Sequence, residues 1–161
     1  MQAIPEQYDD FFDEKGRYLR PEKRLMKKIE SVLDAKHALE NSLNGFIADR
    51  SPIDLFNLWL TRGFSSNSRE SERFQEKCKA YLQKYDFIVF PPWGVLDLIQ
   101  VEDKNAKRKR VMKPWVQFRH HSTMIGIALQ WVPVSKILPI PTNISTSEQR
   151  LAFVLDAVHR E

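Results

Sequence analysis

The hydrophobic positions of this chain follow a helical period in its first half and a strand-like alternation in its second. From Pro21 to Gly45, apolar residues recur at separations of three, four and seven, and a glycine stands where a helix commonly ends. Proline in the first turn supports the same interpretation. The pattern predicts one long amphipathic helix, with apolar positions Leu25, Ile29, Val32, Leu33 and Leu43.

Two further helices are predicted after it. Ser51 followed by Pro52 is a helix start signal, and that helix should stop at Gly63. A third helix is predicted from Arg69 to Tyr85, with the apolar stripe Phe74, Cys78, Tyr81, Leu82 and Tyr85. Because Cys78 belongs to that stripe, we expect a buried thiol rather than a nucleophile.

After residue 86 the pattern becomes β-like. Residues 87–90 are a short apolar run, and residues 95–101 alternate between two faces. Residues 111–118 are predicted to be the second strand of an antiparallel hairpin, with Pro114 at an edge because proline cannot donate a ladder hydrogen bond. A further extended stretch is predicted over residues 124–140, where prolines again confine it to an edge or a bend.

The chain is predicted to close with a helix that starts at a capping box of Ser145 and Glu148 and runs to about Arg160. These elements define an α+β fold, in which N-terminal helices pack on a small antiparallel sheet with a protruding basic hairpin and a closing C-terminal helix. We expect an acidic-aromatic arm over residues 1–20 that packs on a single α+β domain over residues 21–161.

The order of three helices followed by a hairpin resembles that of a winged-helix domain. The resemblance lies in element order and charge placement over residues 21–118, and not in a sequence motif. It implies that the third helix faces the major groove of DNA and that the hairpin acts as the wing.

Composition narrows the class of protein. With 161 residues, of which 42% are hydrophobic and 29% charged, the chain can form one domain with its own core. The single cysteine excludes an intrachain disulfide and a cysteine-based zinc site. The first residues lack signal-peptide features, and no apolar run reaches the roughly 18 residues of a membrane span. We therefore expect a cytoplasmic or nuclear protein without a cofactor.

Positive charge is concentrated in one block. The net charge is +4, and residues 102–121 hold seven Lys or Arg against two acids, for +5. Such a concentration indicates a polyanionic partner, because cationic side chains that contact phosphates release condensed counterions. We predict a non-catalytic nucleic-acid-binding protein, with DNA favoured over RNA. Its predicted binding residues are Lys104, Lys107, Arg108, Lys109, Arg110, Lys113, Arg119, Arg69 and Arg73.

The basic block leaves other interpretations open. It could be a solvated turn without a ligand, a nuclear-import peptide or a contact for acidic lipid. Acids at positions 70, 72 and 76 interrupt the third helix, which favours backbone binding by the hairpin over base-specific contacts. Trp115 and Phe118 offer stacking on unpaired bases, unless they are core residues of the strand.

A protein-interaction module, an adaptor or an inhibitor, is the first alternative function. Its predicted anchors are Tyr8, Phe11 and Phe12 in the arm and Trp93 in the proline-rich turn. Exposed aromatic side chains are frequent binding hot spots. An acidic protein surface would then be the partner of the basic block.

A metal-dependent nuclease is the second alternative. Residues 102–104, Glu-Asp-Lys, follow a predicted strand, and Asp86 or Asp97 could supply another carboxylate for a divalent cation. The triplet His121-Ser122-Thr123 is half of a two-histidine phosphoesterase motif, but no second copy occurs. Since His120 and His121 would alternate on a strand, we expect one buried and one exposed histidine. We predict no catalytic residue and no metal site.

Overall fold

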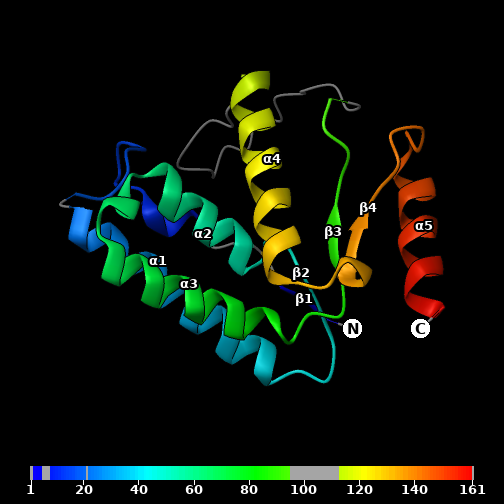
Figure 1. Cartoon of the computed structure of the whole chain (residues 1–161), viewed down its shortest axis with the longest axis horizontal. Helices are drawn as coiled ribbons and strands as arrows, with labels where there is room; N and C mark the ends of the chain where they lie inside the picture. Colours follow the sequence, from blue (N-terminus) through cyan, green and yellow to red (C-terminus); the bar gives the residue numbers. More distant parts are fainter. Residues whose placement is uncertain (1, 5–7, 21, 95–112, 161) are drawn as a thin grey trace. The chain divides into compact units, whose positions relative to one another are not determined.

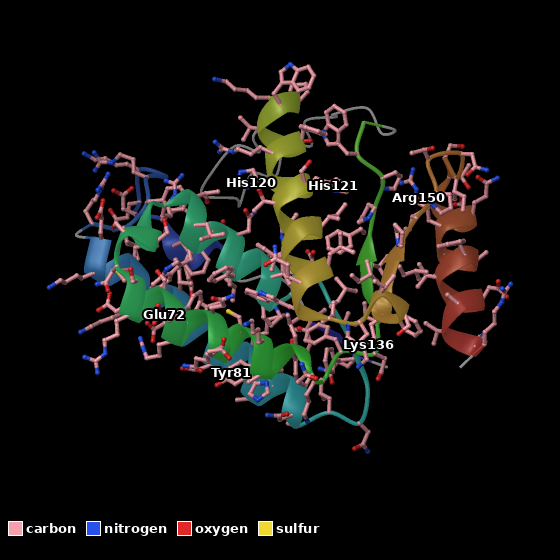
Figure 2. The ribbon with its side chains drawn as sticks, in the orientation of Figure 1. Glu72, Tyr81, His120, His121, Lys136 and Arg150 are labelled. Carbon is pink, nitrogen blue, oxygen red and sulfur yellow. The ribbon has the colours of Figure 1, made fainter. Side chains whose placement is uncertain are left out.

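The computed structural model describes residues 2–4, 8–20, 22–94 and 113–160, and only the backbone of Tyr8. Figure 1 shows the helices and strands of these residues, and Figure 2 shows their side chains. The chain divides into two compact units, which meet in sequence between Lys84 and Tyr85. Five α-helices and two small two-stranded sheets among the described residues confirm the α+β class.

Unit 1 contains β1 (Gln2–Ile4), η1 (Tyr8–Phe11), α1 (Glu22–Asn41), β2 (Phe46–Ala48), α2 (Pro52–Thr61), η2 (Phe64–Ser66) and α3 (Ser68–Leu82). The two strands pair in parallel, with Gln2 opposite Phe46. A parallel pair cannot be joined by a tight turn, and α1 lies in the long crossover that joins these two strands.

Local signals set the ends of the helices in unit 1. Ser51 caps α2 in a capping box with Asp54, as its hydroxyl accepts the amide hydrogen of Ile53 at 3.2 Å. Gly63, at φ 79°, ends α2 in the left-handed conformation that favours glycine, as predicted. The predicted end of α1 at Gly45 is wrong, since the helix stops at Asn41 and Gly45 lies just before β2.

Aromatic rings form the centre of the unit 1 core. Trp59 is fully buried, stacks on Phe74 at 4.4 Å between ring centroids and meets Phe64 edge-on at 5.2 Å. Its indole N–H donates to the Ser71 hydroxyl at 2.9 Å, so the polar atom of this buried ring is satisfied. Cys78 is buried on α3, as expected, and burial raises the pKa of its thiol well above the ordinary value.

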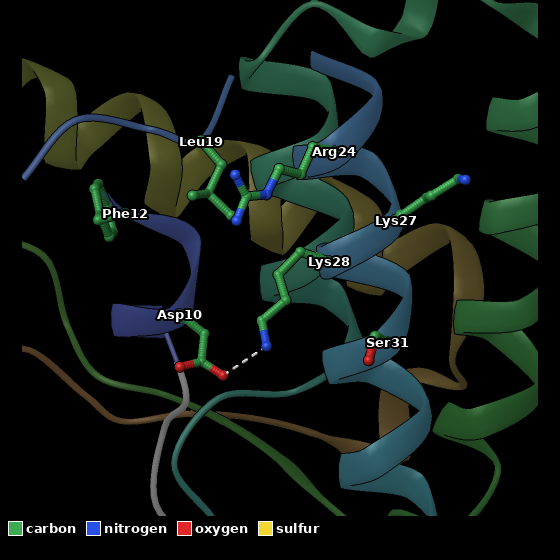
Figure 3. Close-up of a pocket in the computed structure, with 7 residues that line it drawn as sticks. All are labelled: Asp10, Phe12, Leu19, Arg24, Lys27, Lys28 and Ser31. Atoms are coloured by element: carbon green, nitrogen blue, oxygen red, sulfur yellow. Dashed lines mark ion pairs between the residues drawn. The ribbon is translucent and has the colours of Figure 1, made fainter. Parts of the chain in front are cut away.

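Residues of the N-terminal arm contact α1 and one another. Phe11 and Phe12 are buried, and the Phe12 ring lies 4.5 Å from that of Tyr18. Asp10 reaches Lys28 of α1, with 2.9 Å between carboxylate and ammonium. Between the arm and α1 the structure leaves a pocket, shown in Figure 3.

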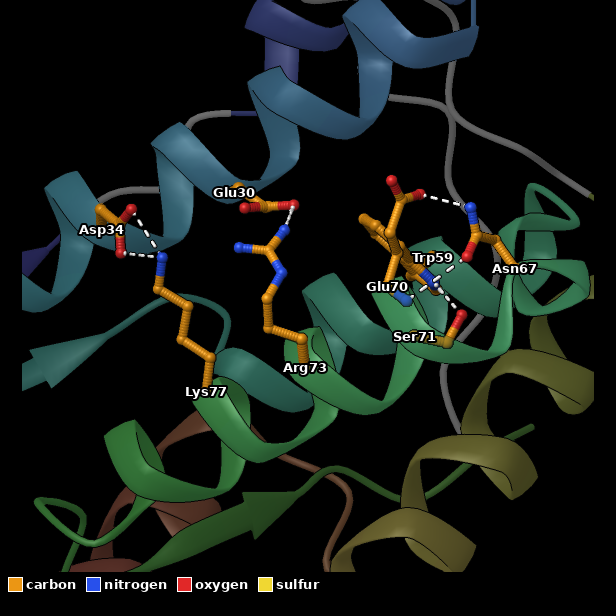
Figure 4. Close-up of polar contacts among 8 residues, drawn as sticks. All are labelled: Glu30, Asp34, Trp59, Asn67, Glu70, Ser71, Arg73 and Lys77. Carbon is orange, nitrogen blue, oxygen red and sulfur yellow. Dashed lines mark hydrogen bonds and ion pairs between the residues drawn. The ribbon is translucent and has the colours of Figure 1, made fainter.

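Ion pairs join the exposed edges of α1 and α3 (Figure 4). The Arg73 guanidinium lies 2.5 Å from the Glu30 carboxylate, and the Lys77 ammonium lies 2.6 Å from that of Asp34. Tyr81 donates its hydroxyl hydrogen to the same Asp34 at 2.9 Å. Acidic side chains of α1 thus pair with basic side chains of α3.

One charged pair of α1 is buried. Glu40 is 1% exposed and Lys36 7%, and their charged groups are 3.4 Å apart, one turn along the helix. Burial of two charges is costly unless they remain together. This pair therefore makes the stability of unit 1 sensitive to the loss of either partner.

Unit 2 contains β3 (Ile88–Phe90), α4 (Pro114–Trp131), η3 (Val134–Lys136), β4 (Ile137–Pro139) and α5 (Ser147–His159). Strands β3 and β4 pair in parallel, with Ile88 opposite Ile137, and α4 lies in the segment between them. Lys136, labelled in Figure 2, donates its ammonium hydrogen to the Tyr85 carbonyl at 2.9 Å and ties η3 to the start of the unit.

Three predicted features of the second half are wrong. Residues 114–118 belong to helix α4 and not to a strand, because Pro114 occupies the first turn, where its missing N–H costs nothing. Residues 124–131 continue that helix, so only residues 137–139 of the predicted stretch form a strand. The described strands also pair in parallel, where an antiparallel sheet was expected. The helix that follows Lys113 interrupts the element order on which the winged-helix resemblance depends.

Helix α5 is present where it was predicted, with two differences. Its capping box is formed by Thr146 and Gln149, one residue later than expected. Its apolar stripe is exposed, with Leu151, Leu155 and Val158 at 60%, 45% and 38%. Among the described residues, no helix combines the length and the apolar character that a membrane crossing requires.

Candidate nucleic-acid interface

Three aromatic rings of unit 2 gather at the start of α4. Trp115 and Phe118 are three positions apart, so they lie on the same side of the helix. The Trp93 ring, from the turn after β3, lies 4.9 Å from that of Phe118 and 6.1 Å from that of Trp115. We call Trp93, Trp115 and Phe118 the aromatic cluster.

The aromatic cluster is open to solvent. Trp115 is 74% exposed and Phe118 44%, whereas Trp93 is half-buried. The alternative that Trp115 and Phe118 are core residues of a strand is therefore wrong. Their contacts are tilted or edge-on, which leaves ring faces free of stacking within the cluster. Large exposed rings in one place are typical of a binding surface.

Two of the predicted binding cations accompany the cluster. Lys113 directly precedes α4, and Arg119 lies one helical turn after Trp115. Both side chains are exposed, and neither forms an ion pair with any residue that the structure describes. Lys113 and Arg119 thus lie close in sequence to the two rings that α4 contributes to the aromatic cluster.

The two adjacent histidines lie further along α4, as labelled in Figure 2. Both are half-buried, so the expected split into one buried and one exposed histidine is wrong, because a helix turns neighbouring residues by about 100° and not 180°. The His121 ring meets Phe90 edge-on at 6.2 Å. Desolvation in this surrounding lowers the pKa of His121.

Most of the predicted basic hairpin lies outside the described residues. This applies to Lys104, Lys107, Arg108, Lys109 and Arg110. It also applies to the Glu-Asp-Lys triplet at 102–104 and to Asp97 of the nuclease alternative. Lys113 is the first residue after this segment that the structure describes.

The predicted cations of α3 have different surroundings. Arg69 is exposed, but Arg73 is held by Glu30 of α1, as Figure 4 shows. The carboxylate of that pair offsets the charge of the guanidinium, which weakens its attraction for phosphate. The structure therefore gives Arg73 a role in joining α1 and α3.

The predicted protein-interaction anchors are also divided by the fold. Phe11 and Phe12 are buried in unit 1, which leaves neither ring exposed as an anchor for another protein. The side chain of Tyr8 lies outside the described residues. Trp93 belongs to the aromatic cluster, in unit 2.

A second basic segment of the chain was not predicted. Residues 15–28 hold seven cations against one acid, for +6, namely Lys15, Arg17, Arg20, Lys23, Arg24, Lys27 and Lys28 against Glu22. Five acids between residues 6 and 14 cancel most of this charge in a sum over the chain. A count in short windows would have found the segment, which forms the first turns of α1 and the turn before it.

Metal ligands do not gather among the described side chains, where no three His, Cys, Asp or Glu residues come together. Comparisons with protein-family models, curated proteins and solved structures find no match to this chain. Its function must therefore be inferred from the residues themselves.

Proposed function

We propose that this chain binds single-stranded nucleic acid without catalysis, through the aromatic cluster and the cations that flank it in sequence. The observation that carries the proposal is the exposure of Trp115 and Phe118 beside Trp93 and Lys113. Unpaired bases offer faces that such rings can stack on, and each stacked base contributes about 1–3 kcal/mol. In a duplex the faces of the bases are covered by stacking, so single strands are the preferred ligand.

Charge supports the same proposal. Residues 104–113 add six cations directly before the Trp115 ring in sequence, and Arg119 adds a seventh. Stacking holds bases with little sequence preference, while cations contact the phosphates between them. The combination of rings and cations in one stretch of chain is typical of single-strand binding surfaces, and DNA is the ligand that the sequence favours.

A salt titration tests this function. Affinity for a dye-labelled single strand of DNA should exceed affinity for the matching duplex and should fall linearly with salt on a logarithmic plot. Changing Lys107, Arg108 and Lys109 together to Gln should weaken binding and make the slope shallower by about 2, since each lost contact removes roughly 0.7 for single strands.

The matched control removes three cations that are remote in sequence from the start of α4, by changing Lys15, Lys23 and Lys84 to Gln. It should leave the slope close to that of the unaltered chain. Equal losses in the two triple variants would show that total charge, and not the segment before α4, governs binding. A preference for duplex would contradict stacking on the aromatic cluster.

A further inference from the structure

The pocket between the N-terminal arm and α1 has a volume of about 470 Å³, within the range of small-molecule sites. It belongs to unit 1 and is separate from the aromatic cluster of unit 2. It is lined by Asp10, Phe12, Leu19, Arg24, Lys27, Lys28 and Ser31. Three cations and one acid give this lining a net charge of +2.

The cations come from adjacent turns of α1. Arg24, Lys27 and Lys28 are three and four positions apart, a spacing at which like charges repel. In Figure 3 the Arg24 guanidinium lies beside Leu19, the Lys28 ammonium points to Asp10, and Lys27 extends away from the arm. An anion in the pocket would relieve this repulsion.

Arg24 and Lys28 differ in their partners. The Lys28 ammonium is 2.9 Å from the Asp10 carboxylate, which partly neutralises it. Arg24 forms no ion pair or hydrogen bond with any residue in the described part of the chain. Its planar fork of donors fits the oxygens of a phosphate, for which arginine is especially suited.

The pocket also has an apolar part. It is formed by Phe12 and Leu19, with Leu19 beside Arg24, and Ser31 adds a hydroxyl one turn beyond Lys27. A bare inorganic anion would leave this apolar part without a contact. The lining therefore matches a ligand that has one anionic end and one organic end.

We propose that this pocket binds a phosphomonoester of about mononucleotide size, with its phosphate on Arg24 and Lys28 and its organic part against Phe12 and Leu19. The phosphate competes with Asp10 for Lys28, so Asp10 sets how tightly the ligand is held. This site is independent of the proposed function, because it shares no residue with the aromatic cluster or with the cations that flank that cluster in sequence.

Calorimetric titration of the full chain tests the proposal with three probes: AMP, phenyl phosphate and adenosine. At least one of the two phosphomonoesters should bind, and adenosine, which lacks the phosphate, should not. Changing Arg24 to Gln should weaken binding about tenfold or more, the usual effect of losing a charge-assisted contact. No binding of either phosphomonoester, or equal binding of adenosine and AMP, would overturn the proposal.

Two further variants make the test specific to the pocket. Lys23→Gln is the matched control, since Lys23 carries the same charge on the same turn but does not line the pocket, and its affinity should stay within about twofold. Asp10→Asn should tighten binding, because Lys28 loses its competitor. An equal loss of affinity in Lys23→Gln and Arg24→Gln, or weaker binding in Asp10→Asn, would overturn the assignment. Thermal melts establish that each variant is folded.

Discussion

Replacing Trp115 by Ala should separate binding from stability. Complete burial makes a Trp→Ala change cost about 3–5 kcal/mol of unfolding free energy. Trp115 is 74% exposed, so only about a quarter of that cost applies, and the unfolding free energy should fall by no more than about 1 kcal/mol. The fully buried Trp59, which also donates to Ser71, should show the complete loss when it is replaced by Ala.

The affinity for a single strand, in contrast, should fall strongly in Trp115→Ala. If one base stacks on Trp115, the substitution removes about 1–3 kcal/mol, which is roughly a 5-fold to 150-fold loss of affinity for a single strand. Anisotropy of a dye-labelled oligothymidine measures the affinity, and urea unfolding followed by circular dichroism measures the stability. Trp115→Phe keeps an aromatic face and should retain most of the affinity.

Two results would refute this reasoning. Unchanged affinity in Trp115→Ala would mean that no base stacks on the ring. A fall of several kcal/mol in unfolding free energy would mean that Trp115 is part of the unit 2 core, in contradiction to its exposure.

Three other predictions concern groups that the fold removes wholly or partly from water. Glu40→Ala should lower the unfolding free energy by about 3–5 kcal/mol, because it leaves the Lys36 ammonium buried without its carboxylate. The double variant Lys36→Met with Glu40→Leu removes both charges and should change the unfolding free energy little. Urea unfolding of both variants measures the difference. Because burial raises the pKa of Cys78, its thiol should react with a thiol reagent at pH 7 only after denaturant is added, and full labelling of the native chain would contradict this. Desolvation lowers the pKa of His121 below its ordinary 6.5, so this imidazole binds a proton more readily in the unfolded chain than in the folded one. The unfolding free energy should therefore be unaffected by His121 above about pH 6.5 and should decrease as the pH falls below that value. Melts of His121→Gln should show a flatter pH dependence in that window, and an unchanged profile would exclude His121 as its source.

Local signals made the helices of unit 1 predictable. Ser51 and Pro52 stand directly at the start of α2 and Gly63 stands directly after its end, so both ends follow from the sequence alone. The end of α1 was less clear, since Gly45 lies in the connection to β2, where a glycine carries the same local signal. For the arm, only the burial of its aromatic residues could be predicted from the sequence.

Helix α4 shows why the second half was harder to predict. Its β-branched residues favour a strand, Gly126 weakens a helix interior, and Pro114 is acceptable both at a strand edge and in the first turn of a helix. Tertiary structure decides between them, because the parallel pairing of β3 with β4 requires a long crossover. The exposure of Trp115 depended on that choice, as a strand would have placed it in the core.

Several charges near the ends of α1 interact unfavourably with the dipole of that helix. Lys23 and Arg24 lie in its first turn, where the aligned peptide dipoles are positive, and Glu40 lies in its last turn, at the negative end, whereas Glu22 alone is favourably placed in the first turn. Each of the three unfavourable charges costs about 0.3–1 kcal/mol at low salt, and Lys27 and Lys28 add repulsion against the cations one turn before them. A peptide of this segment alone should be a poor helix, so α1 owes its conformation to the partners packed against it. Occupancy by an anion at that end would offset the repulsion, which couples the folding of unit 1 to the ionic composition around it.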